Sequence, residues 1–429
     1  MKKLAILILA AALFSCDSVD KKIADANDYN TYLVKSGDTS PDYTEDGVEF
    51  WSMKLNNDSS GVGAIGPLAA AYGRRFKETG QVEYLYDAQR LLEIGVEKSA
   101  HNKDAYMMSL AANFISQHRF RDAKSILEQT REIPSNKRNL ELALFDIEME
   151  LGNYIEAYRL LKKNQRRGDF SHLVRMAKWA DHAGKLDQAI QHLEAAKDLA
   201  FASGDKSLQV WVITNLADYY GHAGEIQKSY DYFLWALQYD PQNAYALKGI
   251  AWINYSHDSN YKEADRILDY LIETSPLPDY YLLKSEIAEA DRRREDAEKW
   301  KAEFLAMAER PEYGRMYNTY IIEALAESNP EAAVERALQE LEERKTAETY
   351  ALFAFSMMKS GKTVNALRIV EEHVIDKTIE PSPTLYASQV LAAAGKIDES
   401  VSLAKELEDA TYELGPVTAL TIQELLIQF

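Results

Sequence analysis

Two histidines and two aspartates lie at positions from which they could share a metal ion. Asp181 and His182 are adjacent, and Asp218 precedes His222 by four residues, about one turn of a helix. Two imidazoles with two carboxylates form a ligand set that zinc accepts. The chain has no compact ligand spacing such as HExxH, so we favour the alternative in which each histidine ends a helix, where its cationic form suits the helix dipole. We therefore predict no metal ion here.

A glycine-rich stretch, residues 61–66, matches the GxGxxG pattern of dinucleotide-binding sites. Such a site needs a β-strand before the glycines and a βαβ unit around them, whereas helical patterns follow here. The sequence instead predicts a flexible loop that leads to Pro67 as the first residue of a helix. The basic runs 162–167 and 292–294 are expected to be solvated turns, and neither GxSxG nor a P-loop motif occurs. We predict a protein that is not an enzyme and binds no cofactor.

The N-terminus has the organisation of an export signal. Two lysines precede an apolar run, residues 4–14, which is too short to span a bilayer but fits a secretory signal. The segment 13–16, Leu-Phe-Ser-Cys, resembles the lipobox of bacterial lipoproteins. This resemblance implies removal of residues 1–15 and covalent lipid on Cys16, whose acyl chains would anchor the protein to a membrane. Cys16 is the only cysteine in the chain, and lipid on its sulfur would leave no thiol for a disulfide or a zinc–thiolate site.

The charge of the chain bears on its partners. The formal net charge is −19, and loss of residues 1–15 would remove two lysines and make it more negative. Such a body repels phosphate backbones, so we expect no nucleic-acid partner and no adhesion of the folded part to anionic lipid. Residues 16–60 are polar and aperiodic, and we expect the lipidated cysteine to be followed by a flexible tether. The expected location is the bacterial cell envelope, with the outer membrane favoured over the inner one.

The elements that would position these residues are short helical hairpins, and residues 211–243 give the clearest example. Two helical patterns flank Gly224, where a left-handed C-cap is favourable, and Pro241 follows the second. The pattern resembles the tetratricopeptide repeat, in which small residues lie where the two helices cross. The residues that carry the resemblance are Leu216, Ala217, Tyr220, Ser229, Phe233, Ala236 and Pro241.

The small residue of the second helix recurs along the chain at steps of 32 to 40 residues, about 35 on average, against 34 in the family. We therefore predict an all-α fold, an elongated right-handed α-solenoid of about ten hairpins over residues 61–412. A C-terminal capping helix, residues 413–429, would cover the last hairpin with Leu420, Leu425 and Phe429. The one step of 40 predicts two lengthened helices that meet at a turn formed by Gly204 and Asp205. The recurring residues are Ala88, Ala123, Ala157, Ala189, Ser229, Ala264, Ala297, Ala333, Ala366 and Ser400.

The resemblance implies that the first helices line a concave face, where the family holds extended peptides or partner helices. Aromatic rings with a few charges suit protein recognition, since Trp and Tyr supply much of the energy at interface hot spots. The alternative for Trp211 and Trp252 is that they pack between adjacent helices. The predicted groove residues are Asp146, Glu150, Lys178, Asp181, His182, Trp211, Asp218, His222, Trp252 and Tyr255.

These observations predict a lipid-anchored scaffold that binds envelope proteins or peptides through its concave face. In architecture it is similar to the repeat lipoproteins that serve barrel-assembly machinery, with about twice their number of repeats. An alternative of another class is glycan binding, because SusD-like lipoproteins are also helical and contain tetratricopeptide units. The long ligand-binding loops of that class are missing from this sequence, where one hairpin follows another with little between them.

Overall fold

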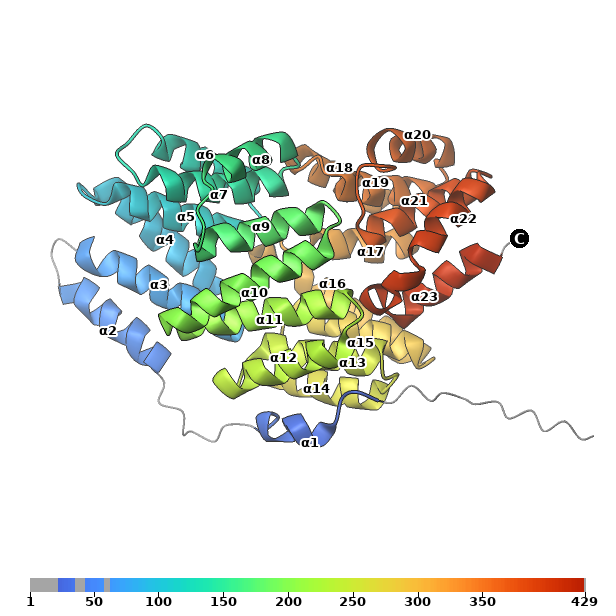
Figure 1. The fold of residues 1–429 in the computed structure, drawn as a ribbon, viewed down its shortest axis with the longest axis horizontal. Helices are drawn as coiled ribbons and strands as arrows, with labels where there is room; N and C mark the ends of the chain where they lie inside the picture. The colour runs from blue at the N-terminus through green and yellow to red at the C-terminus, as the bar shows by residue number, and fades with distance from the viewer. Residues whose placement is uncertain (1–21, 35–42, 58–61, 428–429) are drawn as a thin grey trace, which may run out of the picture.

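In the part of the chain that the structure describes, ten helical hairpins follow one another, each packed on its neighbours (Figure 1). The computed structural model describes residues 22–34, 43–57 and 62–427, and these contain no β-strand. The predicted all-α solenoid is therefore confirmed. None of the helices in the described ranges has the length and hydropathy needed to cross a membrane. Cys16 and the export signal lie outside the described residues.

The described part of the chain begins with three N-terminal elements, which are followed by the first four hairpins. They are α1 Ala26–Tyr29, η1 Asn30–Tyr32, α2 Tyr43–Asn57, α3 Val62–Thr79, α4 Glu83–Lys98, α5 Lys103–Ser116, α6 Phe120–Thr130, α7 Lys137–Glu150, α8 Tyr154–Lys163, α9 Phe170–His182 and α10 Leu186–Ser203.

The remaining elements are six hairpins, two short 3-10 turns and a terminal helix. They are α11 Lys206–His222, α12 Ile226–Tyr239, α13 Ala244–Ser256, α14 Tyr261–Thr274, α15 Pro278–Ala290, α16 Arg294–Ala308, η2 Pro311–Tyr313, α17 Asn318–Ser328, α18 Pro330–Glu343, α19 Ala347–Lys359, α20 Thr363–His373, α21 Pro381–Ala393, α22 Ile397–Glu406, η3 Glu408–Ala410 and α23 Thr411–Ile427.

The recurring small residues lie at the helix crossings, as the spacing predicts. All ten fall in the second helices of the hairpins, from α4 to α22, and all are buried. Ala297, the most exposed of the ten, is only 9% exposed. Short side chains there let the two helix backbones approach closely.

The turns also follow the sequence pattern. Gly224 adopts φ 74° between α11 and α12, a left-handed conformation that costs glycine little. Where glycine is missing, another residue takes the same place: Arg292, between α15 and α16, has φ 61°. The long repeat is confirmed, because α10 ends at Ser203, α11 begins at Lys206, and the Asp205 carboxylate caps α11 by accepting from the amide of Leu208.

The N-terminal region differs from the flexible tether that its composition predicts. Residues 26–32 and 43–57 are helical, and Tyr29 is completely buried. The predicted loop at 61–66 is also wrong, because α3 begins at Val62 and Pro67 lies inside it. Buried apolar residues such as Ile65 and Leu68 recur at helical spacing there, and their burial outweighs the low helix propensity of the glycines.

The solenoid is not elongated, because its first hairpins pack against hairpins about six units later. Tyr86 in α4 donates its hydroxyl to the Glu312 carbonyl at 2.9 Å, and Arg121 in α6 donates to the Glu343 carbonyl at 3.0 Å. Gly80 faces Leu277 so closely that a Cβ would lie 2.1 Å from the leucine side chain. Figure 1 shows early helices α6 and α8 near late helices α18 and α19. The superhelix thus closes on itself and encloses an interior.

The terminal helix α23 covers the last hairpin, as predicted, with Ile422 and Leu425 buried beside Leu385 and Leu407. Leu420, which was expected to share that role, is 59% exposed, and Phe429 lies outside the described residues. The helix begins at Thr411, earlier than expected, and bends at Gly415. Its first turn reaches the middle of the solenoid, where α23 contacts α11, α13 and α15.

Candidate functional site

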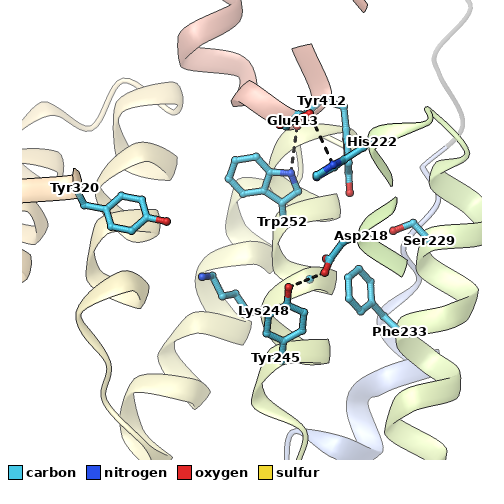
Figure 2. A pocket seen from close by; sticks show the side chains of 11 residues that line it. Asp218, His222, Ser229, Phe233, Tyr245, Lys248, Trp252, Tyr320, Tyr412 and Glu413 are labelled. Atoms are coloured by element: carbon cyan, nitrogen blue, oxygen red, sulfur yellow. Dashed lines mark hydrogen bonds and ion pairs between the residues drawn. The ribbon is translucent and has the colours of Figure 1, made fainter. Parts of the chain in front are cut away.

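The interior of the closed superhelix holds two adjoining cavities, which we call the interior cavities. The first, of about 360 Å³, lies among α11, α12, α13 and the start of α23, with Tyr320 of α17 on its far side (Figure 2). The second, of about 540 Å³, is lined by α7, α9, α17, α19 and α21. Tyr320 and Glu413 line both. Early, middle and late repeats therefore contribute side chains to one hollow region of the solenoid.

Most of the predicted groove residues line these cavities. Asp218, His222 and Trp252 face the first cavity, whereas Glu150, Lys178, Asp181 and His182 line the second. The first helices of the hairpins thus bring together residues that lie up to about 100 positions apart in the sequence.

Three predicted groove residues serve elsewhere. Asp146 lines neither cavity and accepts hydrogen bonds from the Arg175 guanidinium, at 2.5 and 3.1 Å. Trp211 is 43% exposed and meets Phe170 edge-on, with ring centroids 5.9 Å apart. Tyr255 is 1% exposed and packs against Gly415 of α23. Trp252 has a second role as well, because its indole N–H donates to the Tyr412 carbonyl at 3.2 Å.

The two histidines end their helices, as expected, but burial of His182 disfavours the cation that a helix dipole would stabilise. Burial lowers the pKa of His182, and its ring lies 4.0 Å from that of Tyr154. His222 Nδ1 lies 3.9 Å from a carboxylate oxygen of Glu413. Among the described residues, no group of three or more His, Cys, Asp or Glu side chains is placed to hold a metal ion.

Tyrosine hydroxyls, rather than cations, hold several carboxylates of the interior. Tyr245 donates to Asp218 at 2.6 Å, an interaction visible in Figure 2, and Tyr219 donates to Asp181 at 3.2 Å. Tyr386 donates to Glu323 at 2.8 Å. A phenol satisfies a lone pair of the carboxylate without cancelling its charge. When these carboxylates are ionised, the hydrogen bond from tyrosine therefore leaves their negative charge uncompensated.

Burial makes this charge costly and raises the pKa of several interior carboxyl groups. It raises the pKa of Asp218 to about 6 and that of Glu323 to about 7. The pKa of Glu380 also rises to about 7, through burial and the neighbouring Asp181, Glu413 and Glu348. Carboxyl groups close to one another in a poorly solvated space resist simultaneous ionisation.

The basic side chains that line the cavities already have acidic partners. Lys178 pairs with Glu150 at 2.8 Å, and Lys248 pairs with Asp279 at 2.5 Å. Arg344 pairs with Glu340 at 2.9 Å. Each of these pairs balances one basic side chain with one carboxylate. The carboxylates held by tyrosines are additional to these pairs, so the interior has an excess of acidic groups.

Sequence reasoning missed the part of the site that comes from the late repeats. Tyr320, Glu323, Glu380, Tyr386 and Glu413 line the interior cavities, and none was among the predicted groove residues. These residues lie on or beside the first helices of late hairpins, and that position could have indicated that they line the concave face. An elongated solenoid, however, would place them far from α9 and α11.

Comparisons with known proteins concern the fold. No protein-family model and no curated protein sequence matches the chain. Among solved structures, Pseudomonas aeruginosa pilF is 15% identical over 50% of this chain and 96% of its own, with a TM-score of 0.37. Yeast Tom70 is 14% identical over 94% of this chain and 97% of its own, with a TM-score of 0.35. A tetratricopeptide repeat protein from Parabacteroides merdae is 17% identical over 60% and 97%, with a TM-score of 0.33.

The hairpins of this chain, with their spacing and buried small residues, decide the fold. The chain has the tetratricopeptide-repeat fold. In this tetratricopeptide solenoid, closure turns the concave face into the wall of the interior cavities.

Proposed function

We propose that this protein is a non-enzymatic, lipid-anchored scaffold of the bacterial cell envelope that binds a positively charged segment of a partner protein in its interior cavities. The observation that carries the proposal is the excess of carboxylates held by tyrosines, such as Asp218, Asp181 and Glu323. Two further carboxyl groups, Glu380 and Glu413, lie beside them along the second cavity.

A cationic occupant would relieve an electrostatic cost that the protein bears alone. Charges of one sign in a concave, poorly solvated space focus the field and attract ions of the opposite sign. The raised pKa values of Asp218, Glu323 and Glu380 are consistent with this cost, because burial disfavours their ionised forms. A bound ammonium or guanidinium group would favour the ionised carboxylates, so binding would release protons.

The cavity walls suit a Lys or Arg side chain more closely than a simple ion. Trp252, Tyr320 and Tyr412 line the first cavity next to Asp218. Aromatic faces attract cationic groups, and their flat surfaces pack against the aliphatic part of a long basic side chain. A peptide segment with basic residues offers both parts together.

The binding part of the proposal can be tested by isothermal titration of the purified protein with an extended, lysine-rich octapeptide at pH 8. A glutamate-rich octapeptide of the same length serves as the ligand control. We expect binding of the first alone, weakened about tenfold or more by Glu323→Gln. Glu335→Gln, an identical change of charge at an exposed position of α18, should leave the affinity unchanged.

Equal weakening by Glu335→Gln and Glu323→Gln would mean that the peptide responds to net charge alone, and the interior site would be rejected. Tight binding of a neutral oligosaccharide in the same titration would favour the glycan-binding alternative instead. Crosslinking in the native host followed by mass spectrometry would then identify the partner.

The anchor is supported by the sequence around Cys16, an apolar run that leads into a lipobox-like segment. Growth of the host with an alkynyl fatty acid should label the wild-type protein and leave Cys16→Ser unlabelled. The variant should also move from the membrane fraction to the soluble fraction, because a lipid-modified cysteine is the only anchor proposed. Equal labelling of both proteins would refute the proposed lipid site.

A further inference from the structure

The segment closest to Cys16 that the structure describes, residues 22–34, is fixed to the outside of the solenoid. We call it the docked segment. It lies against α12 and α14, which belong to the fifth and sixth hairpins (Figure 1). Ile23, Ala24 and Tyr32 join the apolar core that these hairpins share.

Polar contacts fix the position of the N-terminal end of the docked segment. The Asp258 carboxylate accepts the backbone amides of Ile23 at 3.0 Å and Ala24 at 2.8 Å. Asp258 is itself buried, 8% exposed, and a hydrogen bond of 2.7 Å joins it to His257. The backbone amide of Asp25 donates to the Tyr230 hydroxyl at 3.1 Å.

Tyr29 is the central anchor of this segment. Its side chain is 0% exposed, and its hydroxyl donates to Glu263 at 2.9 Å. Burial, together with Glu263, raises the pKa of Tyr29, so the phenol stays protonated and donates throughout the neutral range. A buried aromatic ring with a satisfied hydroxyl fixes a short segment better than its two short helical turns could alone.

The distance from the lipid site to this anchor is short. Seven residues lead from Cys16 to Ile23. Fully extended, they span at most about 25 Å. A compact chain of this size has a radius of gyration of about 21 Å and is therefore on the order of 50 Å across. The connection is thus shorter than the solenoid is wide. Only the part of the surface near Ile23 can therefore lie close to the membrane.

We propose that the docked segment orients the solenoid, so that the face formed by α12 and α14 is turned toward the lipid bilayer. The opposite edge, which carries α6, α8 and α20 in Figure 1, is then turned toward the aqueous compartment. The full chain carries a formal net charge of −19, and loss of residues 1–15 makes the body more negative, so the short connection, and not attraction to anionic lipid, holds this face near the surface. The inference rests on the lipid at Cys16 proposed above.

The orientation can be measured by energy transfer from a fluorophore on the full-length, lipidated protein to a rhodamine-labelled headgroup in phosphatidylcholine vesicles. Cys16 is the only cysteine, and its thiol would be acylated, so a single introduced cysteine takes the label. Lys262→Cys places the label on α14 next to Glu263, and Val364→Cys places it on α20, where the native side chain is 83% exposed. We expect at least twofold more transfer from position 262.

Two variants of the docked segment separate orientation from anchoring. Tyr29→Ala should release the segment and make transfer from the two positions similar, whereas Val34→Ala, at a side chain that is 65% exposed, should preserve the difference. Equal transfer from positions 262 and 364 in the unmodified segment, with vesicles bound, would overturn the orientation and leave the anchor intact. Failure of the full-length protein to bind vesicles at all would overturn the lipid anchor, and the orientation with it.

Discussion

At the scale of single residues, the interior cavities depend on pairs in which a tyrosine holds a carboxylate. Tyr245 and Asp218 form the shortest of those that line the cavities, with 2.6 Å between the hydroxyl and carboxylate oxygens. Burial raises the pKa of Asp218, whereas the hydrogen bond from Tyr245 lowers it, and the balance leaves it at about 6. The phenol thus favours the ionised form of this carboxylate.

Removal of that phenol tests the balance. Tyr245→Phe should raise the pKa of Asp218 further above 6, by about one unit, because the ionised form loses its donor. Carbon-13 NMR of protein labelled at aspartate carboxyl groups would follow the titration, with Asp218→Asn to assign the signal. Tyr239→Phe, at a ring that packs against Phe201, is the matched control and should not move the titration. An unchanged pKa in Tyr245→Phe would show that the hydrogen bond does not stabilise the carboxylate.

At the scale of elements, α23 closes the last hairpin with one face and reaches the middle of the solenoid with its first turn. Leu425 is 6% exposed, whereas Leu420, on the same helix, is 59% exposed. The sequence could predict that a helix lies here, but both leucines fit its apolar pattern. The bend at Gly415, which changes the path of the segment before it, could not be read from that pattern.

The two leucines therefore form a matched pair. Leu425→Ala should lower the free energy of unfolding by about 2–4 kcal/mol, because it removes buried methyl groups and leaves a cavity. Leu420→Ala should change it by less than about 0.5 kcal/mol. Urea unfolding followed by circular dichroism measures both values. A similar loss in the two variants would mean that α23 packs through a different face from the one described.

At the scale of the whole molecule, the repeats were predictable and their closure was not. Each hairpin depends on apolar spacing within about 34 residues, which the sequence displays directly. Closure depends on small rotations that accumulate from unit to unit, and on contacts such as that between Arg121 and Glu343, 222 positions apart. The burial of Tyr29 likewise depends on Glu263, 234 positions away, so the composition around Tyr29 could not reveal it.

The acidic interior also gives the folded molecule a distinctive dependence on pH. Burial raises the folded-state pKa of Glu286, Glu323 and Glu380 to about 7, with neighbouring carboxylates adding to the effect at Glu286 and Glu380, against a reference value of 4.5. Between these values the folded state binds more protons than the unfolded state. Stability therefore falls as pH rises through 7, by on the order of 1 kcal/mol per carboxyl group between pH 6.5 and 8.

Other shifted groups oppose this trend or act at lower pH. Burial lowers the pKa of histidines such as His182 below 6.5, so their contribution increases with pH and levels off within about one unit above 6.5, which offsets part of the carboxyl effect in the lower part of this range. Glu150 is partly buried, which raises its pKa, but Lys178 and Arg344 outweigh this effect and the pKa is lowered, so its contribution is lost only below 4.5. Urea unfolding at pH 6.5 and pH 8 should thus show lower stability at pH 8, and Glu323→Gln should reduce the difference, whereas Glu335→Gln should not. If stability is equal at the two pH values, the interior carboxyl groups are not strained in the folded protein, and the electrostatic basis for a cationic partner is lost.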